Sequence, residues 1–307
     1  MSIQIENLSK TYDKGKVNAL QNIQLSVSEG ELFGLIGPDG AGKTSLFRIL
    51  TTLLLADSGT ATVCGYDVVR DYKKIRQIAG YMPGRFSLYQ DLSVAENLNF
   101  FATVFNTTIK ENYHLIEDIY VQLAPFKDRP AGKLSGGMKQ KLALCCALIH
   151  EPKILFLDEP TTGVDPVSRR EFWDILARLK ARNITIFVST PYMDEASRCD
   201  RIALIQDGHL LTIDTLENIL RAHPATIYAV SGEKLYPISK ALKAHPAVKS
   251  CFAFGENLHV TLQEDAKNSS FLKQLIENQG FKKIEIFEIK PNIEDVFIGL
   301  MREKNNS

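Results

Sequence analysis

The residues from Gly37 to Thr44 have the types and the spacing of a loop that binds phosphate groups. They read Gly-Pro-Asp-Gly-Ala-Gly-Lys-Thr and fit the pattern G-x-x-x-x-G-K-[ST]. In such a loop, backbone N–H groups and the positive end of the following helix converge on the phosphates. We expect the Lys43 ammonium to contact the β- and γ-phosphates and the Thr44 hydroxyl to ligate magnesium. The expected nucleotide-binding residues here are Gly37, Pro38, Asp39, Gly40, Ala41, Gly42, Lys43, Thr44 and Ser45.

The neighbouring residues predict the strand and the helix that this loop needs. Residues 31–36 (ELFGLI) form an apolar run typical of a buried strand, and residues 45–54 contain no glycine or proline and favour a helix. Tyr12, which precedes a polar turn, can stack its flat ring on an adenine base. The three segments together predict a site for a purine nucleotide.

Two carboxylates and a second glycine-containing helix start extend this chemistry. The buried strand 154–157 (ILFL) ends in Asp158, placed to hold magnesium through water, and Glu159, placed to take a proton from an attacking water. A helix running to residue 149 opens with Ser135-Gly136-Gly137-Met138, which predicts a second anion-binding helix end. Asp165 and Pro166 fit the N-cap and first positions of a further helix.

These segments, in this order, resemble the nucleotide-binding subunit of an ATP-binding-cassette (ABC) transporter over residues 1 to about 220. The matching motifs are the aromatic Tyr12, Walker A (37–44), the signature LSGGM (134–138), Walker B (154–159) and the D-loop (163–165). The resemblance implies that ATP and Mg²⁺ are ligands and that two such domains pair head to tail. Each ATP would then lie between one subunit's Walker A and the other's Ser135, Gly136, Gly137 and Met138, close to Asp165.

The predicted fold class is α/β: a RecA-like P-loop core with an antiparallel β-subdomain and a helical subdomain, followed by a small α+β domain. We place the nucleotide-binding domain at 1–222, with its helical subdomain at about 85–150, and the C-terminal domain at 223–307. Periodicity in the latter predicts β-α-β-β-α-β, the order of a ferredoxin-like unit. Its end, around 291–297, is similar to drug- and polyketide-export ATPases of the ABC-2 type. Its role stays open between packing and ligand sensing.

Composition excludes several classes of function. Lys+Arg and Asp+Glu are equal at 36 each, which argues against nucleic acid as a partner. No apolar run approaches the ~18 residues needed to cross a bilayer, and the first residues lack a signal-peptide pattern. The five cysteines show no metal-ligand spacing and indicate buried thiols in a reducing cytosol. These features predict a cytoplasmic chain, and the resemblance implies that it is peripheral on the inner face of the membrane through a permease.

Two positions depart from the family pattern, and both would weaken hydrolysis. Gly84 stands where the family normally places a Gln that touches the magnesium, and Pro191 stands where it places a His that contacts the γ-phosphate. Neither residue can supply the missing hydrogen bond. Asp39 stands where Asn is commoner, a milder change. Lys43, Thr44, Asp158 and Glu159 are intact, so Mg-ATP binding should survive even where turnover is slow.

The expected function is that of an ATPase subunit of an ABC exporter that drives a separately encoded permease of ABC-2 type. The signature is intact, whereas the chain's own half of the ATP site lacks the two contacts that Gly84 and Pro191 cannot make. This combination favours a heterodimer with a second cassette, although a homodimer is possible. Two alternatives stay open. One is a regulatory subunit that binds nucleotide with little hydrolysis, and the other is a soluble ABC ATPase not linked to transport.

Overall fold

The computed structural model describes residues 1–223, 226–263, 268–281 and 283–305. Contacts within the chain divide it into two compact units, Met1–Leu216 and Glu217–Ser307. This division falls a short way before the expected boundary at residue 222, and the expected C-terminal domain (223–307) includes positions outside the described residues. Among the described residues, no helix combines the length and the hydrophobicity needed to cross a bilayer.

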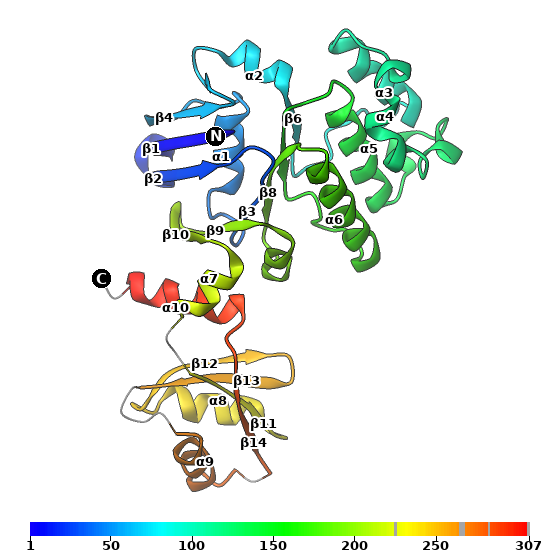
Figure 1. The fold of residues 1–307 in the computed structure, drawn as a ribbon. Helices are drawn as coiled ribbons and strands as arrows, with labels where there is room; N and C mark the ends of the chain where they lie inside the picture. The colour runs from blue at the N-terminus through cyan, green and yellow to red at the C-terminus, as the bar shows by residue number, and fades with distance from the viewer. Residues whose placement is uncertain (224–225, 264–267, 282, 306–307) are drawn as a thin grey trace. The chain divides into compact units, whose positions relative to one another are not determined.

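A six-stranded sheet forms the centre of the first unit (Figure 1). Its order is β10-β9-β3-β8-β7-β6, and every neighbouring pair is parallel except β9 and β10. The strands are β3 (Leu32–Ile36), β6 (Ala79–Met82), β7 (Ile154–Asp158), β8 (Thr185–Thr190), β9 (Arg201–Gln206) and β10 (His209–Asp214). The predicted α/β fold class is confirmed. The apolar runs are continuous because helices cover parallel strands on both faces.

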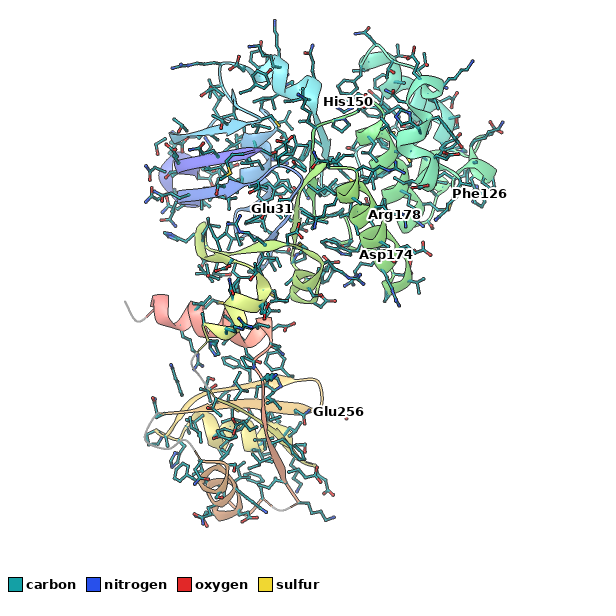
Figure 2. All side chains as sticks on the ribbon, viewed as in Figure 1. Glu31, Phe126, His150, Asp174, Arg178 and Glu256 are labelled. Carbon is teal, nitrogen blue, oxygen red and sulfur yellow. The ribbon has the colours of Figure 1, made fainter. Side chains whose placement is uncertain are left out.

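Alternating side chains of these strands divide the core into two clusters. Phe33, Phe156 and Phe187 pack with α1 (Lys43–Leu50) on one face of the sheet. Leu155 and Leu157 face α5 (Gly136–Leu148) and α6 (Pro166–Ala181) on the other. Asp174 and Arg178 lie on the solvent side of α6 (Figure 2). The helical spacing of four apolar residues in the sequence predicts one buried face for that helix, and all four are buried: Phe172, Ile175, Leu176 and Leu179.

The antiparallel subdomain consists of β2-β1-β4-β5. Its strands are β1 (Ile3–Tyr12), β2 (Val17–Val27), β4 (Ser58–Val63) and β5 (Tyr66–Asp67), with the short turn Asp13–Gly15 between the first two. The sequence predicts the first two strands at residues 3–8 and 22–27. Both are longer in the structure, because bulges in the β1–β2 register allow further polar residues to pair. Helix α2 (Tyr72–Ile78), which the sequence analysis did not predict, leads back to the central sheet.

The helical subdomain contains α3 (Val94–Val104), α4 (Ile109–Tyr120) and the first part of α5. The pattern S-x-x-E at residues 93–96 predicts a capping box, and α3 begins with it: the Glu96 backbone N–H donates to Ser93 Oγ at 3.2 Å, and the Ser93 N–H donates to Glu96 Oε2 at 2.8 Å. Short 3₁₀ turns at Ala124–Phe126 and Ala131–Lys133 follow α4, where Pro125 and Pro130 interrupt the helix.

The second unit has the predicted β-α-β-β-α-β order. Its elements are β11 (Ile227–Ser231), α8 (Leu235–Lys243), β12 (Val248–Phe254), β13 (Asn257–Leu262), α9 (Ser269–Asn278) and β14 (Glu285–Ile289). The sheet order is β12-β13-β11-β14, and all neighbours are antiparallel. Helices α7 (Leu216–Arg221) and α10 (Ile293–Asn305) flank this arrangement in sequence.

Candidate functional site

The Walker A loop joins the carboxyl end of β3 to the N-terminus of α1, as predicted. Gly42 has φ +106°, and a Cβ there would lie 2.2 Å from the carbonyl oxygen of Ala19. A Cβ at Gly37 would lie 2.1 Å from the Ile205 carbonyl oxygen. Only glycine therefore fits both positions, because a Cβ at either one would collide with a backbone carbonyl.

Lys43 is the most deeply buried charged group of the loop, with its side chain 3% exposed. Its ammonium donates to the carbonyl oxygens of Gly37 at 2.8 Å and Pro38 at 2.9 Å. It also forms an ion pair with Glu159 Oε1 at 2.9 Å. A buried ammonium is stable only with such partners, so these contacts keep the charge in place inside the loop.

Asp158 ends β7 next to the loop. Its carboxylate accepts hydrogen bonds from the Ser189 hydroxyl at 2.7 Å and from the Thr44 hydroxyl. Burial raises the pKa of Asp158, while these two hydrogen bonds oppose that rise. The predicted magnesium residues Thr44 and Asp158 thus lie together at the edge of the sheet.

Glu159 is held in a sparsely populated backbone conformation, with φ +50°. Its N–H donates to the carbonyl oxygen of Ser189 at 3.1 Å and to the Ser189 hydroxyl at 3.0 Å. One carboxylate oxygen faces Lys43, and the other accepts from the Thr162 hydroxyl at 3.4 Å. The side chain is 20% exposed, so water can reach a carboxylate that the backbone fixes.

A cavity of about 430 Å³ lies over the loop. It is large enough for part of a nucleotide and open to solvent on one side. The predicted residues that line it are Tyr12, Asp39, Gly40, Gly42, Lys43, Thr44, Ser45 and Glu159, joined by Val17, Asn18 and Ala19 of β2. Gly37, Pro38, Ala41 and Asp158 are not among the lining residues and lie in the supporting layer. The Tyr12 hydroxyl bonds to Ser45 Oγ at 3.1 Å, which fixes the ring beside the loop.

The signature turn lies outside this cavity. Ser135 caps α5 by accepting from the Met138 N–H at 3.4 Å, and both Ser135 and Gly136 are exposed. None of 135–138 lines the cavity. The turn packs instead on the D-loop side: a Cβ at Gly137 would lie 2.7 Å from Ser168 Oγ.

Asp165 has the predicted capping role at the start of α6. It accepts hydrogen bonds from the N–H groups of Val167 at 3.1 Å and Ser168 at 3.0 Å. These bonds hold the pKa of Asp165 below its usual value. Asp165, like the signature turn, does not line the cavity.

Gly84 lies directly beside the carboxylate of Asp158. A Cβ there would be 3.1 Å from the Asp158 carbonyl oxygen and 3.8 Å from its Oδ2. A longer side chain at this position would therefore reach the edge of the sheet where Thr44 and Asp158 meet. Pro191 directly follows β8, and its ring presents no hydrogen-bond donor.

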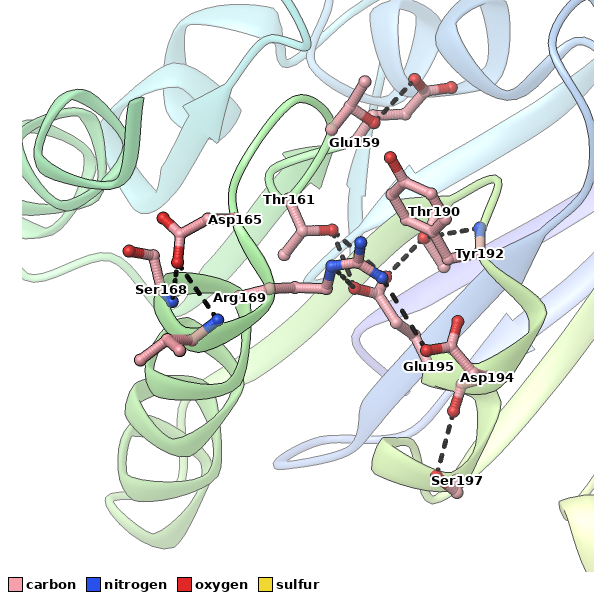
Figure 3. A network of polar contacts seen from close by, with 12 residues as sticks. Glu159, Thr161, Asp165, Ser168, Arg169, Thr190, Tyr192, Asp194, Glu195 and Ser197 are labelled. Carbon is pink, nitrogen blue, oxygen red and sulfur yellow. Dashed lines mark hydrogen bonds and ion pairs between the residues drawn. The ribbon is translucent and has the colours of Figure 1, made fainter. Parts of the chain in front are cut away.

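A polar network that sequence reasoning missed surrounds the segment after Pro191 (Figure 3). At its centre is the buried carboxylate of Glu195, which accepts from the hydroxyls of Thr161 and Thr190. Arg169 of α6 lies close to it. No local pattern marks these residues, because their side chains come from three separate segments that only the folded sheet brings together.

The comparisons with known proteins agree with this geometry. Residues 20–162 match the ABC transporter family. The chain is 38% identical to a probable multidrug ABC transporter ATP-binding protein, YbhF, of Escherichia coli, over 97% of this chain and 52% of that protein. It therefore spans about half the length of that relative.

Two further matches cover more than nine-tenths of the other protein's own chain. The chain is 34% identical to a Nod factor export ATP-binding protein I of Burkholderia orbicola, over 97% of this chain and 96% of that protein. A solved structure of an ATP-binding subunit of an ABC transporter matches 72% of this chain and 92% of its own, with a TM-score of 0.65 and 27% identity. The chain belongs to the family of ABC transporter ATP-binding proteins.

Proposed function

We propose that this chain is the ATPase subunit of an ABC exporter, acting on the inner face of a membrane through a separately encoded permease of ABC-2 type. It pairs with a second cassette, so that its signature turn completes the partner's ATP site. The observation that carries this proposal is that Ser135, Gly136 and Gly137 lie outside the cavity formed by Walker A and Glu159. A helix end that binds anions but faces no anion site of its own chain is explained by a site shared with another chain.

The residues around the cavity fit Mg-ATP. A Cβ at Gly42 would collide with backbone, so the loop keeps the narrow backbone cradle that phosphates need. Among the described residues, no group of three or more His, Cys, Asp or Glu side chains is placed to hold a metal by itself. Thr44 and Asp158 therefore suit Mg²⁺, which usually takes few protein ligands and completes its shell with phosphate oxygens and water. When bound, this ion neutralises charge on the phosphates.

The same residues can perform the protein's part of hydrolysis. Lys43 exchanges its contacts with loop carbonyls and Glu159 for phosphate oxygens, which lowers the energy of the negative charge on the transferring group. Glu159, released from Lys43 and still fixed through Ser189, accepts a proton from the attacking water.

The chain's own site is incomplete. Gly84 leaves the space beside Asp158 without a side chain, and Pro191 offers no donor after β8. Losing one preorganised contact of this type costs ~10²–10³ in rate. We therefore infer that this site mainly holds ATP, while the partner's Walker motifs hydrolyse ATP against this chain's signature. This favours a heterodimer over a homodimer, in which both sites would be slow.

A groove on the first unit suits contact with the permease. It has a volume of about 480 Å³ and lies between β6 and the helices α3 and α5. Its walls carry apolar side chains, including Met82, Leu88, Phe101 and Val104, and Val104 is 56% exposed. Pro83, next to Gly84, also lines it, so an apolar cytoplasmic segment of the permease seated here would adjoin the metal side of the ATP site.

The test is reconstitution with a candidate ABC-2 permease and a candidate second cassette, followed by measurement of ATPase activity and transport in vesicles. We expect both activities to require this chain's Ser135. Transport and ATPase activity that persist in Ser135→Arg would favour the regulatory alternative, in which this chain binds nucleotide without completing the partner's site. A chain that hydrolyses ATP at full rate and co-purifies with no membrane protein would favour the soluble ATPase.

A further inference from the structure

The carboxylate of Glu195 holds together the ends of two neighbouring strands. The side chain is 3% exposed. The Thr161 hydroxyl, just beyond β7, donates to Oε1 at 2.9 Å, and the Thr190 hydroxyl at the end of β8 donates to Oε2. Thr161 lies two residues after Glu159, so Glu195 fixes the segment that carries the proposed general base.

Arg169 connects this carboxylate to helix α6. Its Nε lies 3.9 Å from Glu195 Oε1, its guanidinium is 3.8 Å from Asp194 Oδ2, and its Cζ lies 4.1 Å from the ring centroid of Tyr192 (Figure 3). Nε is buried and has no hydrogen-bond partner. The ion pair is therefore incomplete in this state, and an approach of about 1 Å would form a charge-assisted hydrogen bond.

The first turn of α6, which contains Arg169, also packs against the signature turn. Ser168 directly precedes Arg169, and its side chain is the one that a Cβ at Gly137 would meet at 2.7 Å. Close packing of this kind transmits small displacements, because neither side has spare volume. A continuous path thus runs along the chain from Glu159 to Thr161, through the Thr161–Glu195 hydrogen bond to Arg169, and through Ser168 to the signature turn.

We propose that Arg169 is a positioning residue that couples the occupancy of the chain's own ATP cavity to the placement of its signature turn. Phosphates that draw Lys43 away from Glu159 change the forces on the segment 159–161. Movement of Thr161 then shifts the Glu195 carboxylate, to which its hydroxyl donates. Arg169 completes or releases its ion pair with Glu195, and the first turn of α6 moves with it. The inference rests on the proposed function, because it takes Mg-ATP as the ligand of the cavity.

The chain carries its own reporter for this movement. Trp173 is the single tryptophan of the sequence and lies one helical turn after Arg169 on α6. Its side chain is 3% exposed, and its indole N–H is buried without a hydrogen-bond partner. Its emission therefore reports on changes of packing around α6 rather than on solvent.

The experiment uses the full chain with Mg²⁺ and a non-hydrolysable ATP analogue. Binding is measured by calorimetry, movement of α6 by selectively excited Trp173 emission, and ordering of 134–140 and 163–170 by hydrogen exchange. In the wild type we expect the analogue to shift the emission and to slow exchange in both segments. Arg169→Met should bind with an affinity within about threefold of the wild type and lose most of both responses.

Arg170→Met is the matched control. Arg170 is the next residue of α6, is exposed, and loses the same charge when it is changed. We expect this variant to respond like the wild type. Where Arg169→Met fails to fold, Glu195→Gln replaces it. This variant keeps the shape of the side chain and removes the buried one of the two carboxylates near Arg169, and the same loss of response is expected.

The outcomes separate this inference from the proposed function. An absence of analogue binding in the wild type contradicts the ATP site itself. Binding with unchanged emission and exchange overturns the coupling and leaves the ATP site intact. The coupling is also overturned when Arg169→Met and Glu195→Gln respond as the wild type does, or when Arg170→Met loses the response equally.

Discussion

Two helix N-termini of this chain carry glycines, and their surroundings differ. At α1 the turn is closed by its own chain: Lys43 is buried, pairs with Glu159, and lies beside Asp158 under a cavity. At α5 the turn is open: Ser135 and Gly136 are exposed, and the contacts of Gly137 are with the D-loop side rather than with a cavity.

The difference shows that the same local geometry supports two kinds of site. A helix end supplies N–H groups and a positive dipole in both cases. Only the first has a buried cation that lines a cavity together with a carboxylate, so we propose that only this end forms a binding site by itself. We propose that the second becomes one when another chain brings the nucleotide, and the predictions below test that division.

The largest effect is expected at the closed site. Lys43→Ala should weaken Mg-ATP binding by about 10²-fold or more, because charge-assisted hydrogen bonds to phosphate are lost. Equilibrium titration with Mg-ATP measures this, and a thermal melt shows whether the fold survives. Lys74→Ala, which changes an exposed lysine of α2, is the control and should bind normally. Unchanged affinity in Lys43→Ala would contradict the phosphate-loop assignment.

A second prediction compares the two sites within the reconstituted pair. Ser135→Arg should remove about nine-tenths of the ATPase activity or more, because it blocks the partner's site, where a lost preorganised contact costs ~10²–10³. Glu159→Gln should change activity by less than about twofold, because the chain's own site contributes little. Steady-state phosphate release measures both.

The reverse result has an equally clear meaning. The isolated chain could hydrolyse ATP briskly and lose this activity in Glu159→Gln. Its own site would then be complete, and another residue would replace the His that the family places at the position of Pro191. The asymmetric pair would then be wrong, although ATP binding and the family would stand.

The closed site was predictable from sequence because its parts are local. Gly37 to Thr44 are consecutive, and the buried strand before Asp158 has an apolar pattern that fixes where the carboxylate emerges. The capping box at Ser93 and Glu96 and the cap at Asp165 are likewise local patterns, and the structure contains both.

The network around Glu195 was not predictable because its parts are distant in sequence. Thr161, Thr190 and Arg169 meet Glu195 only where β7 and β8 end and α6 begins. The ion pair of Lys43 with Glu159 was missed for the same reason. The strand lengths in β1 and β2 were underestimated, because a bulged register pairs polar residues that break the alternating pattern.

A smaller effect is expected at the groove that we assign to the permease. Val104→Asp places a charge on an exposed apolar wall and should reduce co-purification with the permease by about tenfold, since burying an unpaired carboxylate is costly. ATP binding by the isolated chain should not change. Val121→Asp is the control, because Val121 is similarly exposed and does not line the groove. Equal losses from both variants would contradict this assignment.

The smallest effect, and the most specific one, is expected from restoring a side chain beside Asp158. Gly84→Gln should raise the turnover of the isolated chain by a few-fold, well below the ~10²–10³ of a full preorganised contact, because Pro191 still leaves the second contact missing. The built Cβ lies 3.1 Å from the Asp158 carbonyl oxygen, so the loop has to yield by a few tenths of an ångström, which also limits the gain. Gly84→Ala adds that same Cβ without the amide. It therefore separates the steric effect of the Cβ on the loop from the effect of the amide on hydrolysis. Turnover of Gly84→Gln above that of Gly84→Ala, at equal affinity for Mg-ATP, would show that the amide acts on the reaction. Equal rates in the two variants would mean that the space beside Asp158 is not where this chain's site is deficient.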